Sequence, residues 1–428
     1  LFQTMGRGIK VSEVDLARAF DFLKDPNLIS ELIKNVPVKD LITIILSLAV
    51  KSEAGDLHIE PTETDVKIRL RIDGVMHDIL RLSKEHYLPV LGEIKLLSGF
   101  VTNVKQATMD GRFTIYLDKS KMDCRVSIIS GGYGETIVIR LLSGKEGALN
   151  MDVLGIEDYS LRVLTESMKK TKGIIISTGP TGSGKTTTLY SVLKTLNKSD
   201  VKIITVEDPI EYQMEGIIQT QINAEQGYTF ASAMRSLLRQ NPNIMMIGEI
   251  RDEETAKIAI EAALTGHLVL STIHANSASG AISRFLGLGV DRQQLANSIE
   301  CSIGQRLARK ICPYCSQEAV IEPAILTEIK NILAQIKSPT VKVPTDLKFY
   351  KGVGCDKCNF IGYKGRIGLY ETIGSNPEIG KAIQNPAFSD YDIEQVAIEN
   401  GMVTMLQDGV LKALNGKTTI DEVFRVCK

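Results

Sequence analysis

The 428-residue sequence contains no tryptophan, and aromatic residues make up only 5% of it. An excess of either charge is also missing, because 50 lysines and arginines stand against 51 aspartates and glutamates. Proteins dedicated to nucleic-acid binding usually carry a clear basic excess. The charge balance therefore argues against nucleic acid as the partner.

Long apolar runs are missing as well. The longest candidate, Leu41 to Val50, contains Thr43 and Ser47 and is shorter than the ~20 residues that a membrane-spanning helix needs. The first residues lack the basic and apolar regions of a signal peptide. Leu1-Phe2-Gln3 looks like the remnant of a cleaved expression tag, so we expect the natural amino terminus to lie outside this sequence.

The length predicts two or three domains, and the pattern changes along the chain. After a mixed, charged stretch over 1–35, helical spacing predicts a helix over 36–50. Apolar residues then alternate from Val66 to Ile72, and Asp73-Gly74 marks a hairpin turn before the next run. We expect an α+β domain over 36–145, built on an antiparallel sheet and followed by a linker over 146–155.

The pattern over 156–310 predicts an α/β domain. Short apolar runs alternate with helical segments, as buried parallel strands and their crossover helices do. The expected strands are Gly173–Ser177, Lys202–Val206, Ile244–Ile247 and Leu268–Ile273. The expected helices are Thr186–Leu196, Ser232–Leu238 and Glu253–Leu264. A cysteine-containing subdomain over 311–372 and a helical region over 373–428 complete the chain.

A phosphate-binding motif follows the first of these strands. Residues 179–186 read GPTGSGKT, which matches G-x-x-x-x-G-K-[ST] in full between a strand and a helix. Lys185 can place its charge on the β- and γ-oxygens, and the Thr186 hydroxyl can bind Mg²⁺. The residues expected to bind ATP and Mg²⁺ here are Gly179, Pro180, Thr181, Gly182, Ser183, Gly184, Lys185, Thr186 and Thr187.

Acidic residues follow the next two strands. Glu207, Asp208 and Glu211 lie in the segment TVEDPIEY, at a strand end where open α/β sheets bind ligands. One of the three can polarise the attacking water, and we also expect Glu207 and Asp208 to belong to the ATP- and Mg²⁺-binding residues. Taken alone, the segment also fits a solvated acidic turn before a proline. Glu249 ends the third strand and can reach Mg²⁺ or its water ligands, although pairing with Arg251 is the alternative.

Two histidines, His267 and His274, flank the strand expected at Leu268–Ile273. A histidine at a strand end beside a γ-phosphate can hydrogen-bond it and report hydrolysis. We therefore assign His267 as a candidate sensor and His274 as a candidate catalytic residue. A purely structural role remains the alternative for each.

Four of the seven cysteines form two C-x-x-C pairs, Cys312 with Cys315 and Cys355 with Cys358. In a large chain without a recognised export signal, this pattern favours a metal over disulfides. Four thiolates make a closed tetrahedral site, and zinc is favoured over an iron–sulfur cluster because the site looks structural. The alternatives are two unrelated pairs of buried thiols or a zinc-binding nucleic-acid module. Residues 316–354 must fold as an excursion between the pairs.

Together these segments resemble the secretion ATPase superfamily, specifically its type IV pilus assembly and type II secretion branch. The resemblance runs from about Val36 to the end of the chain. Its motifs are GPTGSGKT, TVEDPIEY, GEIRD at 248–252 and TGHLVLSTIHAN at 265–276, with GDLHIEP at 55–61, RLRIDG at 69–74, DGR at 110–112 and RVS at 125–127 in the first domain. GYKGRIG at 362–368 resembles the segment after the cysteines in the assembly branch, whereas retraction motors usually lack the tetracysteine element.

The resemblance implies roles for individual residues. Glu211 is implied to activate water, Glu249 to hold the Mg²⁺ shell, and His274 to act near the γ-phosphate. Three arginines of the first domain are implied to approach the nucleotide and neutralise charge, although without the resemblance each would be interpreted as a surface ion pair. They are Arg112, Arg125 and Arg140.

The resemblance also implies an architecture: a RecA-like α/β P-loop NTPase domain preceded by a smaller α+β, PAS-like domain, with a zinc-binding insertion and a C-terminal helical region. It implies a homohexamer at the cytoplasmic face of the inner membrane. This ring would use ATP, Mg²⁺ and Zn²⁺ and push on a membrane platform protein. Two departures, Asn241-Pro242-Asn243 in place of Asp-Pro-Asp and Gly55 in place of serine, touch no residue assigned to chemistry.

Three alternatives stay open at this stage. One is a pilus-retraction or DNA-conjugation ATPase of the same superfamily. Another is a nucleotide-gated scaffold without productive hydrolysis, and the last is a DNA translocase.

Overall fold

The computed structural model describes residues 8–24, 36–102, 108–142 and 150–428. It divides into two compact units, one of Leu1–Lys145 with Val353–Lys364 and one of Glu146–Gly352 with Gly365–Lys428. The expected tag remnant and part of the expected linker, residues 146–149, lie outside the described residues. Among the described residues, no helix is both long enough and apolar enough to cross a membrane.

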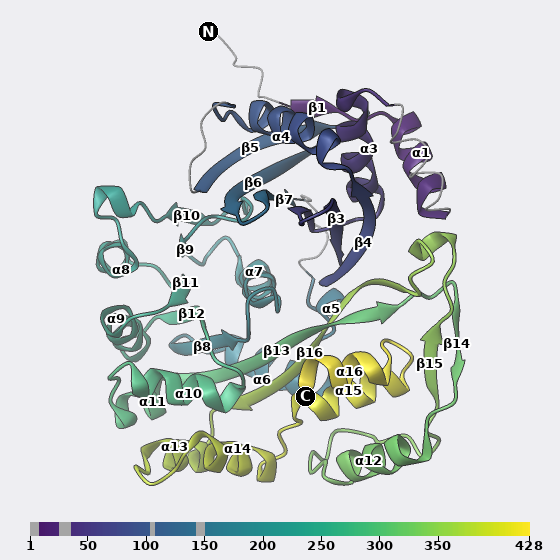
Figure 1. Ribbon diagram of the computed structural model, residues 1–428. Helices are drawn as coiled ribbons and strands as arrows, with labels where there is room; N and C mark the ends of the chain where they lie inside the picture. Colours follow the sequence, from purple (N-terminus) through teal and green to yellow (C-terminus); the bar gives the residue numbers. More distant parts are fainter. Residues whose placement is uncertain (1–7, 25–35, 103–107, 143–149) are drawn as a thin grey trace. The chain divides into compact units, whose positions relative to one another are not determined.

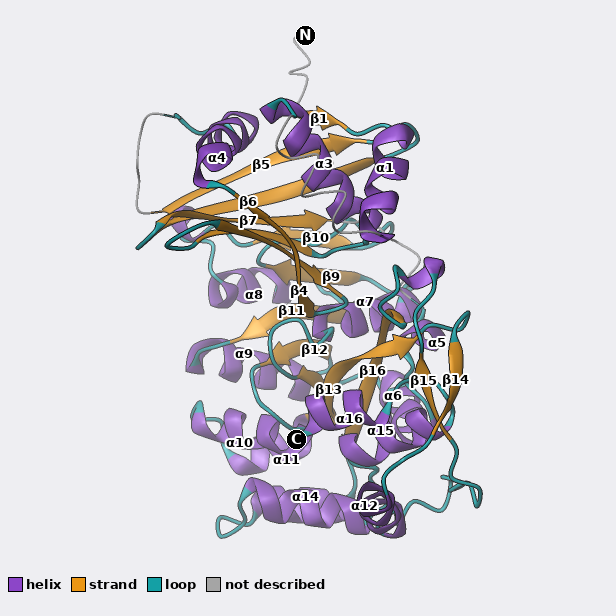
Figure 2. Cartoon of the chain, turned by 45° about the vertical axis from the view of Figure 1, so that its right-hand side comes forward, coloured by secondary structure: helices purple, strands orange, loops and turns teal. Residues whose placement is uncertain are grey.

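The first unit contains a seven-stranded sheet in the order β1-β5-β6-β7-β2-β3-β4 (Figure 1). Its pairings are antiparallel except that β1 runs parallel to β5. Helices α3 and α4 lie on one face of this sheet (Figure 2). The elements are β1 (Gly8–Lys10), α1 (Glu13–Lys24), α3 (Val38–Lys51), β2 (Asp56–Pro61), β3 (Val66–Ile72), β4 (Val75–Leu82), α4 (Lys84–Ser98), β5 (Thr108–Tyr116), β6 (Lys121–Gly131) and β7 (Gly134–Leu142).

The predicted alternation and turn of this unit are confirmed. In β3 every second residue from Val66 to Ile72 is buried in the core, and the residues between them face outward. Asp73 and Gly74 adopt φ angles of 48° and 86°, the left-handed values that a two-residue hairpin turn requires. The helix predicted over 36–50 is α3, Val38–Lys51.

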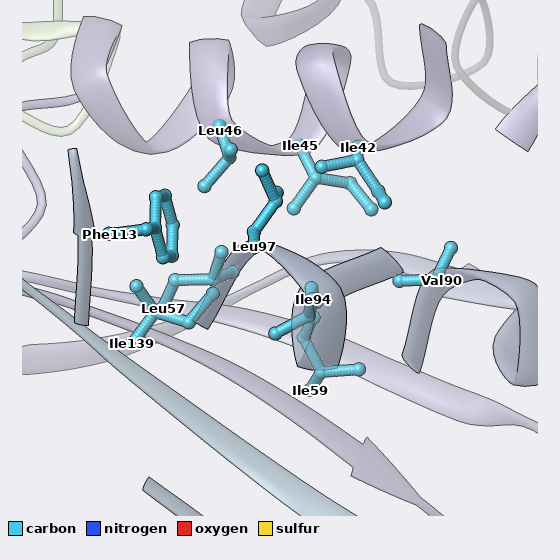
Figure 3. Close-up of a pocket in the computed structure, with 10 residues that line it drawn as sticks. All are labelled: Ile42, Ile45, Leu46, Leu57, Ile59, Val90, Ile94, Leu97, Phe113 and Ile139. Atoms are coloured by element: carbon cyan, nitrogen blue, oxygen red, sulfur yellow. The ribbon is translucent and has the colours of Figure 1, made fainter. Parts of the chain in front are cut away.

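A small apolar cavity lies between α3, α4 and the sheet (Figure 3). Its volume is about 10 Å³, and side chains such as Ile45, Leu97 and Phe113 line it. This volume is at the lower limit for a single water molecule, and the lining offers no polar partner for one. The cavity is therefore a packing void of the core.

The second unit contains a sheet in the order β10-β9-β11-β12-β8-β13-β16, in which the pairings from β10 to β13 are parallel. Helices cover both faces: alternate residues of β8 enter two different apolar clusters, Ile174 and Ile176 one and Ile175 the other. The predicted parallel α/β arrangement is thus confirmed. The elements that build it are β8 (Gly173–Thr178), α7 (Lys185–Leu196), β9 (Ile203–Glu207), β10 (Ile218–Gln221), α8 (Phe230–Leu238), β11 (Ile244–Ile250), α9 (Glu253–Leu264), β12 (Leu268–Ile273), α10 (Ala278–Gly287), α11 (Arg292–Ser298) and β13 (Ile299–Ile311).

Apart from the 3₁₀ turn η3, which lies between β10 and α8, the remaining elements precede β8 or follow β13. The excursion between the cysteine pairs contains an antiparallel strand pair, β14 with β15, and the segment that joins these strands contains helix α12. Helices α13 to α16 form the predicted helical region at the end of the chain. These elements are α5 (Met151–Leu154), α6 (Asp158–Met168), the 3₁₀ turn η3 (Ala224–Gln226), β14 (Ser316–Ala319), α12 (Pro323–Ala334), β15 (Phe349–Gly352), the 3₁₀ turn η4 (Asp356–Cys358), β16 (Tyr363–Gly374), α13 (Pro377–Gln384), α14 (Asp390–Glu399), α15 (Met405–Leu414) and α16 (Ile420–Cys427).

Candidate functional site

The predicted phosphate loop joins the carboxyl end of β8 to the first residue of α7. Gly182 and Gly184 adopt φ angles of 78° and 91°, which side chains other than glycine rarely tolerate. A Cβ atom at Gly179 would lie 2.5 Å from the carbonyl oxygen of Gln305, so this position also has to be glycine. The loop thus has the tight, glycine-dependent path that lets backbone N–H groups surround a phosphate.

Lys185 is the first residue of α7, and its side chain is buried. Its ammonium group donates hydrogen bonds to the carbonyl oxygens of Gly179 and Pro180, at 2.8 and 3.0 Å, so it lies over the loop. Burial lowers the pKa of Lys185; the nearby carboxylate of Glu249 works against this shift, and Arg306 adds to it. The ammonium group therefore lies within electrostatic reach of Glu249, the predicted Mg²⁺-shell residue.

Glu249 lies in an irregular part of β11. The register with β12 shifts between Ile247 and Ile250, which is the signature of a bulge that re-aims side chains. A Cβ atom at Gly248 would lie 3.3 Å from the carbonyl oxygen of Val206, so the glycine allows β9 to approach β11 closely at this point. The hydroxyl of Thr272 donates to the Gly248 carbonyl at 2.7 Å and holds the bulge from the neighbouring strand.

The structure brings His274 to Glu249. The His274 Nε2 atom lies 3.4 Å from Glu249 Oε2, and Arg251 forms an ion pair with the same carboxylate. The residue after His274 is fixed to the phosphate strand, because the Thr178 hydroxyl both donates to the Ala275 carbonyl and accepts from its N–H. The pairing with Arg251, considered from the sequence as an alternative, therefore exists beside the contact with His274.

The three acidic residues of the TVEDPIEY segment differ in their surroundings. Glu207 is buried, and its carboxylate accepts hydrogen bonds from Tyr190, from Thr205 at 2.5 Å and from Gln219 at 3.1 Å. Asp208 and Glu211 are exposed. This geometry ties Glu207 to helix α7 through Tyr190 and leaves the other two carboxylates accessible; their predicted roles stay predictions.

The structure does not bring His267 to the phosphate loop. His267 precedes β12, at the amino ends of the parallel strands, and its carbonyl oxygen accepts from the Gly173 N–H at 3.1 Å. The phosphate loop follows the carboxyl end of β8, six strand residues away, or roughly 20 Å at the usual rise per residue. A sensor role for His267 has no support from its position within this unit.

The three arginines of the first unit lie side by side on three adjacent strands. In the strand register, Arg112 of β5 faces Arg125 of β6, and Arg125 faces Arg140 of β7. All three are exposed. The Asp56 carboxylate accepts hydrogen bonds from Arg140 Nε at 2.9 Å and from Arg71 Nε at 3.0 Å. Like charges directly opposite one another are unfavourable, so this row is suited to an anion.

The four predicted cysteine ligands come together in one cluster. Their sulfur atoms all lie within 4.8 Å of one another, and three of the four residues are buried. Cys355 and Cys358 sulfurs are 3.8 Å apart, close to the ~3.8 Å edge of a tetrahedron with zinc–sulfur bonds of ~2.3 Å. Backbone N–H groups of Cys355 and Gly362 point at the Cys358 sulfur at 3.2 and 3.3 Å. This donor set fits Zn²⁺.

Sequence reasoning missed two neighbours of the phosphate loop, Gln305 and Arg306 on β13. Gln305 is buried and hydrogen-bonds Ser177 and Ser183, while Arg306 donates to the Asn276 carbonyl at 2.9 Å. The available signal was a glutamine at the end of CSIGQ, residues 301–305, a stretch whose other residues are small or apolar. Only the parallel pairing of β13 with β8 reveals their place.

Residues 31–425 match the family described as type II/IV secretion system protein. The chain belongs to this family. Among the relatives of this chain, type II secretion system protein E of Pectobacterium carotovorum subsp. carotovorum is 39% identical over 418 residues, covering 97% of this chain and 81% of the relative. The type IV pilus assembly ATPase PilB of Myxococcus xanthus is 40% identical over 392 residues, covering 91% and 68%.

Two solved structures share the fold of this chain. The pilus retraction motor PilT with bound ADP aligns with a TM-score of 0.56 at 25% identity, covering 89% of this chain and 95% of that one. The ATPase DotB of Yersinia pseudotuberculosis aligns with a TM-score of 0.65 at 20% identity, covering 92% and 95%. The predicted resemblance is thus confirmed, and the chain is a P-loop ATPase of the secretion and pilus group.

Proposed function

We propose that this chain is the ATP-hydrolysing subunit of a homohexameric motor that powers type IV pilus assembly or extension of a type II secretion pseudopilus. The observation that carries the proposal is the meeting of Lys185, Glu249 and His274 at one edge of the sheet. A phosphate-binding ammonium group, a Mg²⁺-shell carboxylate and a γ-phosphate partner are the groups that phosphoryl transfer to water requires. The curated relatives in the secretion and pilus-assembly branch support the same function.

The work of hydrolysis is divided among several residues of this chain. Loop N–H groups and Lys185 hold the phosphates, Thr186 and Glu249 hold Mg²⁺ and its waters, and Glu211 accepts the proton of the attacking water. Mg²⁺ neutralises charge on the β- and γ-oxygens when it is bound. His274 detects the γ-phosphate through Glu249, its neighbour at 3.4 Å.

The arginine row supplies further positive charge. Arg112, Arg125 and Arg140 approach the nucleotide when the first unit, which we infer to be PAS-like, moves against the RecA-like unit. An arginine delivered to developing phosphate charge accelerates phosphoryl transfer strongly. Cyclic motion of this kind would push on an inner-membrane platform protein from the cytoplasmic face.

The tetracysteine cluster distinguishes the proposed assembly or secretion motor from the retraction motors of the same superfamily. Zn²⁺ bound by Cys312, Cys315, Cys355 and Cys358 would be structural, because four thiolates leave no open position for water. Assembly motors carry this element and retraction motors usually lack it, so the cluster favours an assembly or secretion motor. Neither the balanced charge nor the composition favours a DNA translocase.

Two measurements on the purified chain test the motor proposal. Native mass spectrometry with Mg²⁺ and a slowly hydrolysed ATP analogue should show six subunits per assembly. In the second measurement, with ATP and Mg²⁺, the same chain should release phosphate at steady state. A ring that binds ATP but releases no phosphate, even with the platform protein added, would favour the nucleotide-gated scaffold instead.

A further inference from the structure

The phosphate loop has a side-chain support on β13 that its sequence motif does not contain. Gln305 follows Gly304, the last β13 residue paired with β8. Its side chain is only 1% exposed, and both ends of its amide are bonded. The Oε1 atom accepts from the Ser177 hydroxyl at 2.9 Å, and Nε2 donates to the Ser183 carbonyl at 2.7 Å.

We propose that Gln305 is a positioning residue for nucleotide binding, which orients the Ser183–Gly184 peptide of the phosphate loop. The inference rests on the proposed role of this loop in binding the phosphates of ATP. Gln305 itself would not touch the nucleotide. It would act through the direction of one backbone N–H group.

Peptide geometry carries the argument. A trans peptide is planar, and its C=O and N–H groups point in opposite directions. Because Nε2 of Gln305 holds the Ser183 carbonyl, the N–H of Gly184 must point away from β13. Backbone N–H groups of this part of the motif are those that bind phosphate oxygens. Fixing the carbonyl on one side therefore presents the donor on the other.

The amide orientation is set by its partners. A carbonyl oxygen can only accept a hydrogen bond, so the group facing Ser183 must be the NH₂ end. The Ser177 hydroxyl then supplies the donor that the opposite oxygen needs. Leucine at position 305 would provide neither group, and glutamate would present a second acceptor, and a negative charge, to a loop that binds phosphates.

Residue 305 also lies close to two glycines of the loop, to one through its backbone carbonyl and to the other through its side-chain amide. A Cβ atom at Gly179 would lie 2.5 Å from the Gln305 carbonyl oxygen, and one at Gly184 would lie 3.1 Å from Gln305 Nε2. One residue of β13 therefore leaves little space for a side chain at the first and at the last glycine of the loop. This double contact explains why the small residues of the motif are needed on this side of the loop.

If Gln305 had only a structural role, its replacement would change stability but not nucleotide affinity. The chain offers a matched control for this alternative. Gln407 is also buried, and its amide bonds the Thr404 N–H at 2.9 Å and the Ile332 carbonyl at 3.4 Å, at the start of α15. Gln407→Leu should lower the melting temperature without changing nucleotide affinity in the folded protein. Gln305→Leu should weaken affinity itself.

The experiment is a titration of Mg·ADP against Gln305→Leu, Gln305→Glu, Gln407→Leu and Lys185→Ala, with ATP turnover measured on the same samples. We expect the dissociation constant to rise about tenfold for Gln305→Leu, the cost of one misplaced charge-assisted hydrogen bond. Gln305→Glu should lose more, and Gln407→Leu should stay within twofold of the wild type. Because the N–H contact serves the ground and transition states alike, KM for ATP should rise more than kcat falls.

The outcomes distinguish failure of the Gln305 positioning role from failure of the phosphate-binding site itself. Loss of affinity in Lys185→Ala, with both Gln305 variants within twofold of the wild type, would overturn the positioning role and leave the phosphate site standing. Unchanged affinity in Lys185→Ala would instead overturn the phosphate site itself. If the Gln305 variants do not fold, Ser177→Ala keeps the test open: it frees the amide to rotate and should weaken Mg·ADP binding about threefold, and no change would overturn the proposal.

Discussion

The His274 Nε2 atom lies 3.4 Å from Glu249 Oε2, which places the end of β12 in contact with the bulge of β11 beside the phosphate loop. Glu249 thus has His274 on one side and Arg251 on the other, and its side chain is only 14% exposed. A carboxylate restrained in this way is suited to hold a metal shell in place. Glu211, which is exposed, is better suited to take a proton from water.

Glu211→Gln should separate nucleotide binding from hydrolysis. The amide keeps the shape of the side chain but cannot accept a proton, so turnover should fall by ~10²-fold or more while Mg·ATP affinity stays nearly constant. Phosphate release and equilibrium binding on the same sample measure the two effects. Glu253→Gln, at an exposed helix position paired with Lys257, is the matched control and should change neither. If Glu249→Gln stops turnover and Glu211→Gln does not, the proton acceptor is misassigned.

The purified chain should contain one Zn²⁺ per subunit, bound by the four clustered thiolates. Cys355→Ser should lose the metal and destabilise the excursion over 316–354 first, because metal binding and local folding are coupled. Elemental analysis gives the ratio, and limited proteolysis locates the loosened segment. Cys427→Ser, outside the cluster, should keep a ratio near one. A wild-type ratio near zero in protein prepared without chelator would refute the site.

Arg125→Ala should reduce turnover at least tenfold, because the middle arginine of the row would no longer neutralise charge on the phosphates. Little change in melting temperature is expected, since the side chain is exposed. Arg81→Ala is the control in the same unit: Arg81 is exposed on β4 and paired with Asp65 at 2.7 Å. Equal turnover in the two variants would argue that the row is an ordinary charged surface.

Glu422 should make the second unit sensitive to acid. Burial by itself would raise the pKa of this carboxyl group, but hydrogen bonds from Arg425 and Arg309 outweigh burial and lower it from 4.5 to about 2. A folded-state pKa below the unfolded value means that the stabilisation is complete above about pH 4.5 and is lost as the pH falls toward 2. At neutral pH, Glu422→Gln should cost roughly 3 kcal/mol of unfolding free energy.

Urea unfolding of the second unit at several pH values measures this effect. The difference between the wild type and Glu422→Gln should be constant above about pH 4.5 and shrink below it. Glu399→Gln removes an exposed ion pair with Lys337 and is the control, which should change the unfolding free energy by less than about 1 kcal/mol. A Glu422→Gln difference that is independent of pH down to about 2 would contradict the assigned ion pairs.

Sequence patterns predicted the parts of the fold that burial alone determines. The continuous apolar runs became β8, β9, β11 and β12, and the alternation from Val66 to Ile72 became β3. The phosphate loop could be predicted because its glycines and Lys185 are local in sequence. The pairing of Arg112, Arg125 and Arg140 needed the strand register, which the sequence pattern does not give.

Other features depend on contacts between distant segments. Gln305 supports the loop only because β13 runs parallel beside β8, 128 residues earlier in the chain. The burial of Glu207 depends on Tyr190 and Gln219, which reach it from α7 and β10. His267 and His274 looked equivalent in the sequence, yet they lie at opposite ends of one strand, so only His274 reaches the phosphate edge.

The most direct test of the account is ATP turnover by the wild-type chain and by Lys185→Ala, measured side by side as phosphate release with Mg²⁺ present. Lys185 lies over the phosphate loop and supplies its positive charge, so its removal should abolish binding or turnover while the circular dichroism spectrum stays unchanged. The account predicts hydrolysis by the wild type and none above background by the variant. Near-normal hydrolysis by folded Lys185→Ala would contradict it.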